Sequence, residues 1–199
     1  MRCLRPKALC VCDGLRPAES RTRVFLLQHP REARLAICSA WLTRLSLANA
    51  ELHRGVRFAD HPRVAEIVST PGTALLFPGP GARAPQDLAG DPPAALIVVD
   101  GTWLQAERML RDNPEIAVLP RIALPPGCES GYGELRREPG PGCLSTIEAV
   151  ALALGAMERD PARFAPMIAA FRRSVDLQLA CARGERRNPR HRPPREPRP

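Results

Sequence analysis

The sequence predicts an α/β protein in which a mostly parallel sheet carries helices on both faces. Leu96–Val99 is a run of four apolar residues, three of them β-branched, which is typical of a buried parallel strand. Asp100 and Gly101 form a tight turn after it, and Thr102 with Gln105 fits a capping box that begins a helix. In open sheets of this kind ligands bind beyond the carboxyl ends of the strands, so we expect the chemistry to lie near Asp100.

The local pattern allows two roles for the carboxylate of Asp100. It can cap the turn, as aspartates at strand ends often do. It can also belong to a ligand site, where the free N–H groups of the following helix would face an anionic group. The strand and the turn alone leave both interpretations open.

The length and composition indicate one globular domain with a charged tail. A chain of 199 residues with 44% hydrophobic residues can bury one sizeable core. No apolar run approaches the roughly 18 to 20 residues that a membrane span needs, and no signal-peptide core is seen, so we expect a soluble, cytoplasmic monomer. Residues 183–199 hold seven arginines, two glutamates and five prolines, which predicts a disordered tail. Such a tail either attracts phosphates or is merely solvated.

The first residues form a cysteine-rich segment without helical or strand periodicity. Cys3, Cys10 and Cys12 lie within ten residues of one another. In a compartment that keeps thiols reduced, this spacing favours a zinc site over disulfides. Structural zinc usually takes four protein ligands and the segment offers three, so thiols without a metal are the alternative.

The next part of the chain predicts a strand, a helix and a second, short strand. An apolar run begins at Arg23 and stops at His29 and Pro30, as a first core strand would. His29 is either a base or a structural histidine. A helical pattern opens at Arg31, and we expect a turn over residues 49–55 and a strand over 56–58. The apolar stripe of this helix should face the core: Ile37, Trp41, Leu45 and Ala48.

Two more strands are predicted, one before and one after the central strand in the sequence. Thr73–Phe77 reads as a buried strand that ends in a loop of prolines and glycines, which either brings the backbone close to a ligand or only connects two elements. After the central strand, a helix over Trp103–Asp112 should end at Asn113 and Pro114. A further strand is expected over Ile116–Leu124.

The last third of the chain predicts a loop and two helices. Tyr132 lies close to Arg136 and Arg137, a combination that stacks a base and holds phosphates, or that occurs in an ordinary surface loop. Ser145 and Glu148 fit a second capping box at the start of an alanine-rich helix. Asp160 and Pro161 should cap the last helix, in which Pro166 bends or resets the first turn. Its core stripe should be Phe164, Met167, Ile168, Phe171 and Val175.

Several ordered motifs, spread over roughly residues 3–180, resemble the DTW-domain family. The cysteine segment is similar to that of the family from its second cysteine onward, so either the chain begins further upstream or the site has degenerated. The other motifs are His-Pro-x-Glu at 29–32, Leu-Phe-Pro-Gly at 76–79, Asp-x-Thr-Trp at 100–103 and Leu-Ser-Thr-x-Glu-Ala at 144–149.

This resemblance implies a tRNA-uridine aminocarboxypropyltransferase with a fold similar to SPOUT-type RNA-modifying enzymes, whose sheet is knotted around S-adenosylmethionine. The implied reaction moves the 3-amino-3-carboxypropyl group to N3 of a tRNA uridine and leaves methylthioadenosine. The resemblance also implies a zinc segment at 1–20 and a DTW catalytic domain at 21–182, with the tail at 183–199.

We therefore expect Asp100 to accept the N3 proton, directly or through water. RNA contacts are expected from Arg31, Arg34, Tyr132, Arg136 and Arg137, and metal ligands are Cys3, Cys10 and Cys12. Three chain segments, together with the single residue Leu124, should hold S-adenosylmethionine. The residues are Leu76, Phe77, Pro78, Gly79, Asp100, Gly101, Thr102, Trp103, Leu124, Gly142, Leu144, Ser145 and Thr146.

Two other functions compete with this one. A SPOUT-type RNA methyltransferase would use the same crevice and the same cofactor but would transfer the methyl carbon. A non-catalytic protein that binds zinc and RNA would account for the thiols and arginines without any use of Asp100. Enzymes that bind dinucleotides or ATP are poor candidates, because neither of their glycine-rich phosphate-binding patterns occurs in the chain.

Overall fold

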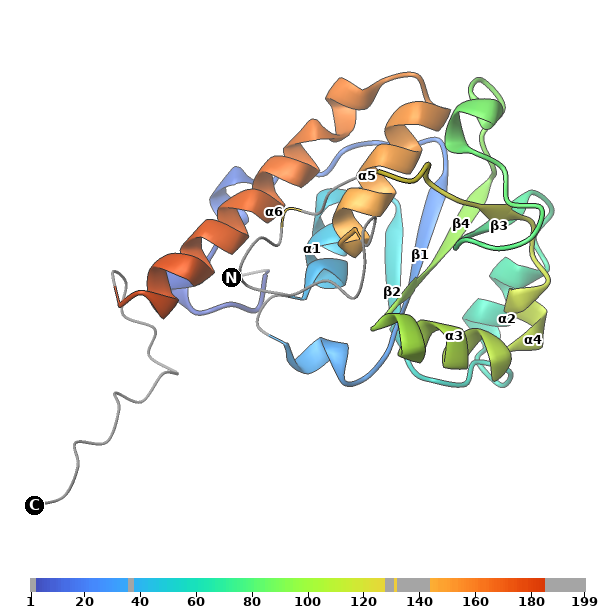
Figure 1. The fold of residues 1–199 in the computed structure, drawn as a ribbon, viewed down its shortest axis with the longest axis horizontal. Coiled ribbons are helices and arrows are strands. Elements are labelled where there is room, and N and C mark those ends of the chain that lie inside the picture. Colours follow the sequence, from blue (N-terminus) through green and yellow to red (C-terminus); the bar gives the residue numbers. More distant parts are fainter. Residues whose placement is uncertain (1–2, 36–37, 128–130, 132–143, 185–199) are drawn as a thin grey trace, which may run out of the picture.

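A computed structural model of the chain describes residues 3–35, 38–127, 131 and 144–184. Five parallel strands form one sheet in the order β2-β1-β4-β3-β5, which confirms the predicted α/β class with a parallel sheet (Figure 1). Because every pair is parallel, the carboxyl ends of all five strands meet at one edge of the sheet. The strands are β1 (Arg23–Gln28), β2 (Ala50–Arg54), β3 (Thr73–Leu76), β4 (Ala95–Asp100) and β5 (Arg121–Ile122).

Helices cover both faces of this sheet, as predicted (Figure 1). One face carries α1 (Ser39–Ser46), α5 (Thr146–Met157) and α6 (Pro161–Ala182). The other face carries α2 (Pro62–Val68), α3 (Trp103–Arg111) and α4 (Pro114–Ala117). Four short 3-10 turns complete the described elements: η1 (Lys7–Leu9), η2 (Cys12–Gly14), η3 (Glu32–Arg34) and η4 (Pro85–Leu88).

The strands alternate between the two cores. In β4, Leu96 and Val98 are buried against the α5 and α6 side, whereas Ile97 is buried against the α2 and α3 side. Successive side chains of a strand point to opposite faces, so the last residue, Asp100, lies on the same face as Val98. The carboxylate is therefore directed toward the face on which α5 begins.

The helix predicted from Arg31 is interrupted, and its predicted stripe is wrong. The chain forms η3, then Leu35 takes an extended conformation, and α1 begins only at Ser39. The extended residue breaks the 3.6-residue period, so a stripe counted from Arg31 does not continue into α1. Trp41 and Leu45 are half-buried and Ala48 is exposed, while Ile37 lies outside the described residues; the buried positions of α1 are Ser39, Ala40, Leu42, Thr43 and Ser46.

The turn predicted over residues 49–55 is the edge strand β2, and residues 56–58 form no strand. An edge strand pairs on one side only, here with β1, so its side chains stay half-buried and polar residues are tolerated. Arg63 of α2 donates to Glu51 of this strand at 2.6 Å. These hydrogen bonds from Arg63 lower the pKa of the Glu51 carboxyl to about 2 and connect the edge strand to α2.

The strand predicted over Ile116–Leu124 is also much shorter, because α4 occupies its first part. Pro114 is the first residue of α4, a position where its fixed backbone angle suits a helix start. Asn113 before it is buried, and its side-chain oxygen accepts a hydrogen bond from the backbone of Phe58 at 2.6 Å. Only Arg121 and Ile122 then pair with β3.

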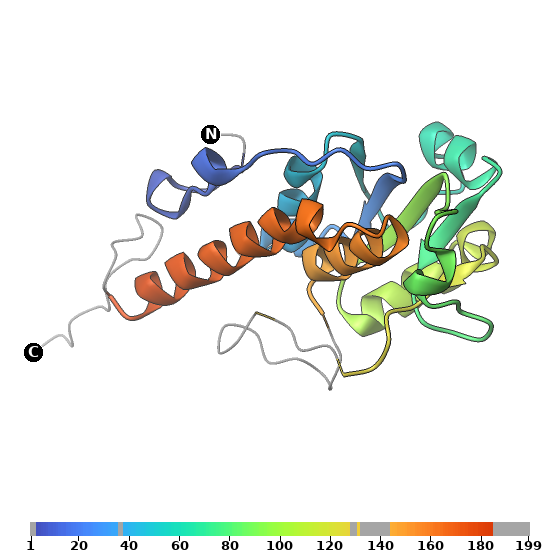
Figure 2. The ribbon, with the colours of Figure 1, turned by 90° about the horizontal axis from the view of Figure 1, so that it is seen from above.

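The amino-terminal segment lies beside α6, and both extend past the sheet (Figure 2). The predicted stripe of α6 is confirmed, with Ile168 half-buried and the other four residues buried, and the helix continues through Pro166. Cys3, Val11 and Leu15 are buried in the same core as α6. Among the helices in the described part of the chain, none combines the length and apolarity required to cross a bilayer.

Candidate active site

A cavity of about 350 Å³ lies at the carboxyl ends of β3, β4 and β5. This volume falls in the range of pockets that bind small molecules, roughly 300 to 1,000 Å³. Its walls come from segments far apart in the sequence: Leu76, Phe77, Pro78, Val98, Val99, Gly101, Trp103, Ala106, Ile122, Ala123, Leu124, Pro125, Pro126, Leu144, Thr146 and Ala149.

The three segments expected to hold a cofactor meet at this cavity. Many of the predicted residues line it: Leu76, Phe77, Pro78, Gly101, Trp103, Leu124, Leu144 and Thr146. Their predicted neighbours Gly79, Asp100, Thr102 and Ser145 are adjacent to these residues in the chain but do not line the cavity. Gly142 lies outside the described residues. Sequence reasoning did not find the remaining wall residues, because apolar residues in a strand or loop carry no signal that they border a cavity.

Two aromatic side chains shape one wall of the cavity, and Arg121 lies beside one of them. The rings of Phe77 and Trp103 lie 5.4 Å apart, and Trp103 remains 38% exposed. Arg121 donates from Nη1 to the carbonyl of Pro78 at 2.7 Å. A Cβ atom added at Gly79 would lie 2.6 Å from that Nη1. Glycine, which has no Cβ, therefore allows this close approach between the loop and the Arg121 side chain.

Asp100 is the last residue of β4 and is 6% exposed. The hydroxyl of Thr146, at the start of α5, donates to its Oδ1 at 2.5 Å. The amide of Gln28 donates to its Oδ2 at 2.9 Å. Because Thr146 also lines the cavity, one hydroxyl connects the cavity to the buried carboxylate.

Strand register explains why Gln28 reaches Asp100. The two residues end neighbouring strands and are partners in the β1–β4 pairing, so their side chains leave the same face of the sheet. Arg54, which ends β2, is in turn the partner of Gln28, and its Nε donates to the Gln28 side-chain oxygen at 3.1 Å. Arg54, Gln28 and Asp100 thus form one row across three strands, and only the pairing could have revealed that row.

Cys38, which precedes α1, is a second partner of Gln28. The Gln28 amide donates to its sulfur at 2.9 Å. Burial, together with the negative charge of Asp100, raises the pKa of the Cys38 thiol. A raised pKa favours the protonated thiol, which is the weaker nucleophile.

Both predicted capping boxes are present. Thr102 and Gln105 exchange hydrogen bonds at the start of α3. Ser145 and Glu148 do the same at the start of α5, where both side chains are buried. The amide of Gly131 also donates to Glu148 Oε1 at 2.8 Å, so the buried carboxylate binds the backbone at that residue as well.

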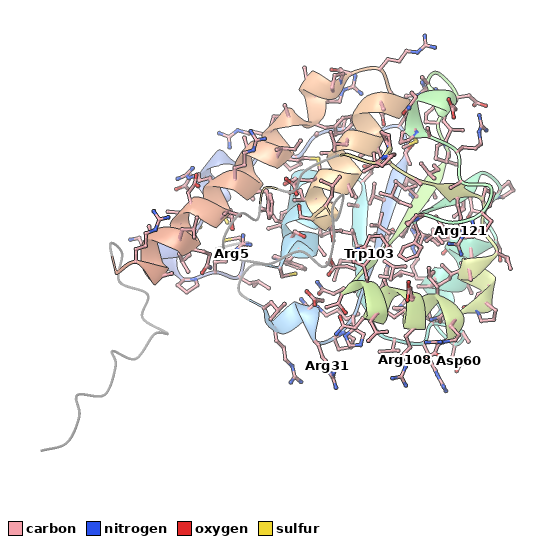
Figure 3. The ribbon with its side chains drawn as sticks, viewed as in Figure 1. Arg5, Arg31, Asp60, Trp103, Arg108 and Arg121 are labelled. Carbon is pink, nitrogen blue, oxygen red and sulfur yellow. The ribbon has the colours of Figure 1, made fainter. Side chains whose placement is uncertain are left out.

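The residues predicted to bind RNA are only partly described. Arg31 and Arg34 are exposed on and beside η3, just after the carboxyl end of β1. Arg31 and Arg108 extend away from the molecule along the edge where α3 lies (Figure 3). Tyr132, Arg136 and Arg137 lie outside the described residues.

The three amino-terminal thiols lie together. The sulfur atoms of Cys3, Cys10 and Cys12 are all within 4.8 Å of one another. Burial would raise the pKa of Cys3, but hydrogen bonds from the backbone of Val11 and Arg5 and from the neighbouring thiols outweigh it and lower that pKa to about 7. Three close sulfurs, one of them readily ionised, suit a soft or borderline metal such as zinc.

A parallel sheet with a cavity at its carboxyl edge and a buried carboxylate at the end of β4 defines an α/β protein with a small-molecule site. Comparison with known sequences identifies the group more closely. The chain belongs to the DTW domain family, which matches residues 1–179. No solved structure matches the chain.

The relatives of this chain include animal and plant proteins. It is 32% identical over 170 residues to tRNA-uridine aminocarboxypropyltransferase 2 of Drosophila melanogaster, covering 80% of this chain and 66% of that protein. The mouse protein of the same name is 30% identical, covering 80% of this chain and 56% of the relative. tRNA-uridine aminocarboxypropyltransferase A of Arabidopsis thaliana is 30% identical, over 79% of this chain and 72% of that protein. The chain spans less than two thirds of the length of these two animal relatives.

Proposed function

We propose that this protein transfers the 3-amino-3-carboxypropyl group of S-adenosylmethionine to N3 of a tRNA uridine and releases methylthioadenosine. The observation that carries the proposal is the similarity, over about four fifths of the chain, to relatives named for that reaction. The cavity at the carboxyl edge of the sheet supports it, since this is where open α/β sheets hold their ligands.

The cavity wall suits the adenosine and methyl end of S-adenosylmethionine. Phe77 and Trp103 offer ring surfaces for the base, and Leu76 and Leu124 offer aliphatic surface beside them. The segments 76–79, 100–103 and 142–146 would hold this co-substrate, whose sulfonium supplies an already activated carbon. The enzyme then has to choose which carbon faces the uridine, which is a matter of positioning.

The protein itself must remove the N3 proton, and Asp100 is the acceptor in this proposal. Because Thr146 lines the cavity and donates to Asp100, the proton path runs through its hydroxyl. As N3 forms its bond to carbon, the bond from that carbon to sulfur breaks and methylthioadenosine leaves; the N3 proton moves to Thr146 Oγ1, and the hydroxyl proton of Thr146 moves to Asp100 Oδ1. Gln28 holds the other carboxylate oxygen and keeps the group oriented.

We extend the proposal to the rest of the chain. Residues 1–20 form a zinc segment in which Cys3, Cys10 and Cys12 provide three thiolates, and residues 21–182 form the catalytic domain with a SPOUT-like knotted path. Arg31, Arg34, Tyr132, Arg136 and Arg137 contact tRNA, and the tail at 183–199 adds salt-sensitive attraction to it. A monomer in the cytoplasm fits these substrates.

Two measurements test the proposed reaction. Mass spectrometry of tRNA nucleosides from cells with and without the gene should find aminocarboxypropyluridine only when the gene is present. Purified protein given S-adenosylmethionine and tRNA from the deletion strain should release methylthioadenosine. Release of S-adenosylhomocysteine would identify a methyltransferase instead, and a protein that does not bind S-adenosylmethionine would be a non-catalytic RNA-binding protein.

A further inference from the structure

A second, smaller cavity lies on the other side of Asp100. Its volume is about 150 Å³, less than half that of the first cavity. The amino-terminal segment, η3, the start of α1, the end of β2 and the outer part of α6 form its walls. The residues that line it are Cys3, Leu4, Arg5, Pro6, Leu9, Ala33, Arg34, Leu35, Cys38, Trp41, Arg54 and Gln178.

Three arginines line the second cavity. Arg5, Arg34 and Arg54 reach it from three separate parts of the chain, and no aspartate or glutamate is among its lining residues, all of which the structure describes; the thiol of Cys3 is in the same wall. Arg34 is exposed, and its side chain makes no hydrogen bond or ion pair with any described residue. Guanidinium groups that converge without a carboxylate form a site for an oxyanion, and arginine binds phosphate oxygens in pairs.

The second cavity is connected to the carboxylate through hydrogen bonds. Arg54 donates to Gln28 at 3.1 Å, and Gln28 donates to Asp100 at 2.9 Å. The guanidinium of Arg54 also lies 5.8 Å from the centre of the Trp41 ring, which holds it against the wall. Thr146 links Asp100 to the first cavity, so the acid lies between the two cavities in one row of side chains.

We propose that the second cavity binds a backbone phosphate of the tRNA next to the target uridine. This inference rests on the proposed function and names the part of the substrate that the site takes. A volume of about 150 Å³ suits a phosphodiester group but not a whole second cofactor. Arg31 projects from the chain just before η3 and would continue the positive path outside the cavity (Figure 3). A tRNA phosphate bound by Arg54 would determine the position of the neighbouring uridine relative to Asp100.

The test uses Arg34→Gln, because Arg34 has no partner among the described residues whose loss would disturb the fold. Arg21→Gln is the matched control: Arg21 is exposed, and it precedes β1 at the opposite, amino edge of the sheet. Arg34→Lys restores the charge. Binding of fluorescein-labelled tRNA from the deletion strain is measured by anisotropy over a range of NaCl concentrations, and binding of S-adenosylmethionine by calorimetry.

We expect Arg34→Gln to weaken tRNA binding about 3- to 10-fold and to reduce the slope of log K against log salt by roughly 0.7, the value for one lost phosphate contact on a single strand. Arg34→Lys should keep most of that slope, and Arg21→Gln should match the unmodified protein. Affinity for S-adenosylmethionine should be the same in all four proteins.

Equal tRNA affinities and slopes for Arg34→Gln and Arg21→Gln would overturn the inference. A titration with inorganic phosphate at constant ionic strength separates a free anion from RNA: phosphate binding that is lost in Arg34→Gln, with tRNA binding unchanged, would also overturn it. If the protein bound tRNA in the expected way but released no methylthioadenosine, the proposed function would fail while the phosphate site remained.

Discussion

At the scale of single residues, the hydroxyl of Thr146 links the cavity to the buried acid. Asp100 is held by Thr146 on one oxygen and by Gln28 on the other, and it is only 6% exposed. A carboxylate fixed in this way does not have to reorganise when it accepts a proton, which is how positioned groups accelerate proton transfer. In the proposed reaction, the hydroxyl is therefore the group whose removal should interrupt proton transfer.

Thr146→Val keeps the shape of the side chain but removes the hydroxyl. Given the proposed reaction, we expect the single-turnover rate of methylthioadenosine formation to fall roughly 100-fold or more, the usual range for loss of a proton-transfer group. Thr146→Ser keeps the hydroxyl and should retain most of the rate. Calorimetry should find the affinity for S-adenosylmethionine little changed in both. Equal rates for the two variants would show that the proton does not pass through residue 146.

At the scale of elements, the first turn of α5 supplies side chains both to the cavity wall and to the buried core. Thr146 and Ala149 line the cavity, while Ile147 and Val150 on the same helix are buried. The helix begins with a buried capping box in which Ser145 Oγ donates to Glu148 Oε2 at 2.5 Å. The corresponding box at Thr102 of α3 is exposed. Water can replace a lost hydrogen bond only in the exposed box.

Ser145→Ala should therefore cost more stability than Thr102→Ala. We expect a loss of about 2 kcal/mol for the buried cap, because a charged side chain loses a buried hydrogen bond, and of about 0.5 to 1 kcal/mol for the exposed cap. The difference is measured by urea denaturation followed by circular dichroism. Equal losses in the two variants would mean that burial of Glu148 does not matter to the cap.

At the scale of the whole molecule, the amino-terminal segment covers one end of the core and forms one wall of the second cavity. Cys3 and Leu9 are buried, and both also line that cavity. The segment has only short 3-10 turns, so little backbone hydrogen bonding stabilises it by itself. A metal bound by its three thiols would hold it against α6.

Purified protein should contain about one zinc ion per chain, measured by plasma mass spectrometry. Removal of the metal with a chelator should lower Tm by roughly 4 to 8 °C, which corresponds to about 2 kcal/mol for a chain of this size. Cys3→Ser should lose most of the zinc. Cys181→Ser, at the end of α6 and apart from the three thiols, should keep it. Full zinc content in Cys3→Ser would exclude this site.

The elements that sequence reasoning found are those set by local interactions. β4, α3 and both capping boxes were predicted, because a cap depends on hydrogen bonds between residues three positions apart. The break before α1 and the edge strand β2 were missed. Before α1 the spacing of apolar residues suggested one continuous helix, and at β2 the polar residues suggested a turn. The actual conformation in both places depends on what the segment packs against.

By itself the sequence determined the class of fold, the two helix starts at the cavity and the position of Asp100 at the end of the central strand, because each is a pattern of neighbouring residues. Only the tertiary structure decided that Arg54, Gln28 and Asp100 stand in one row and that Thr146 lies between that row and the cavity. These residues are up to 118 positions apart, from residue 28 to residue 146, and the register of strand pairing alone brings the first three together. Register is a property of the assembled sheet, so no local pattern carries it.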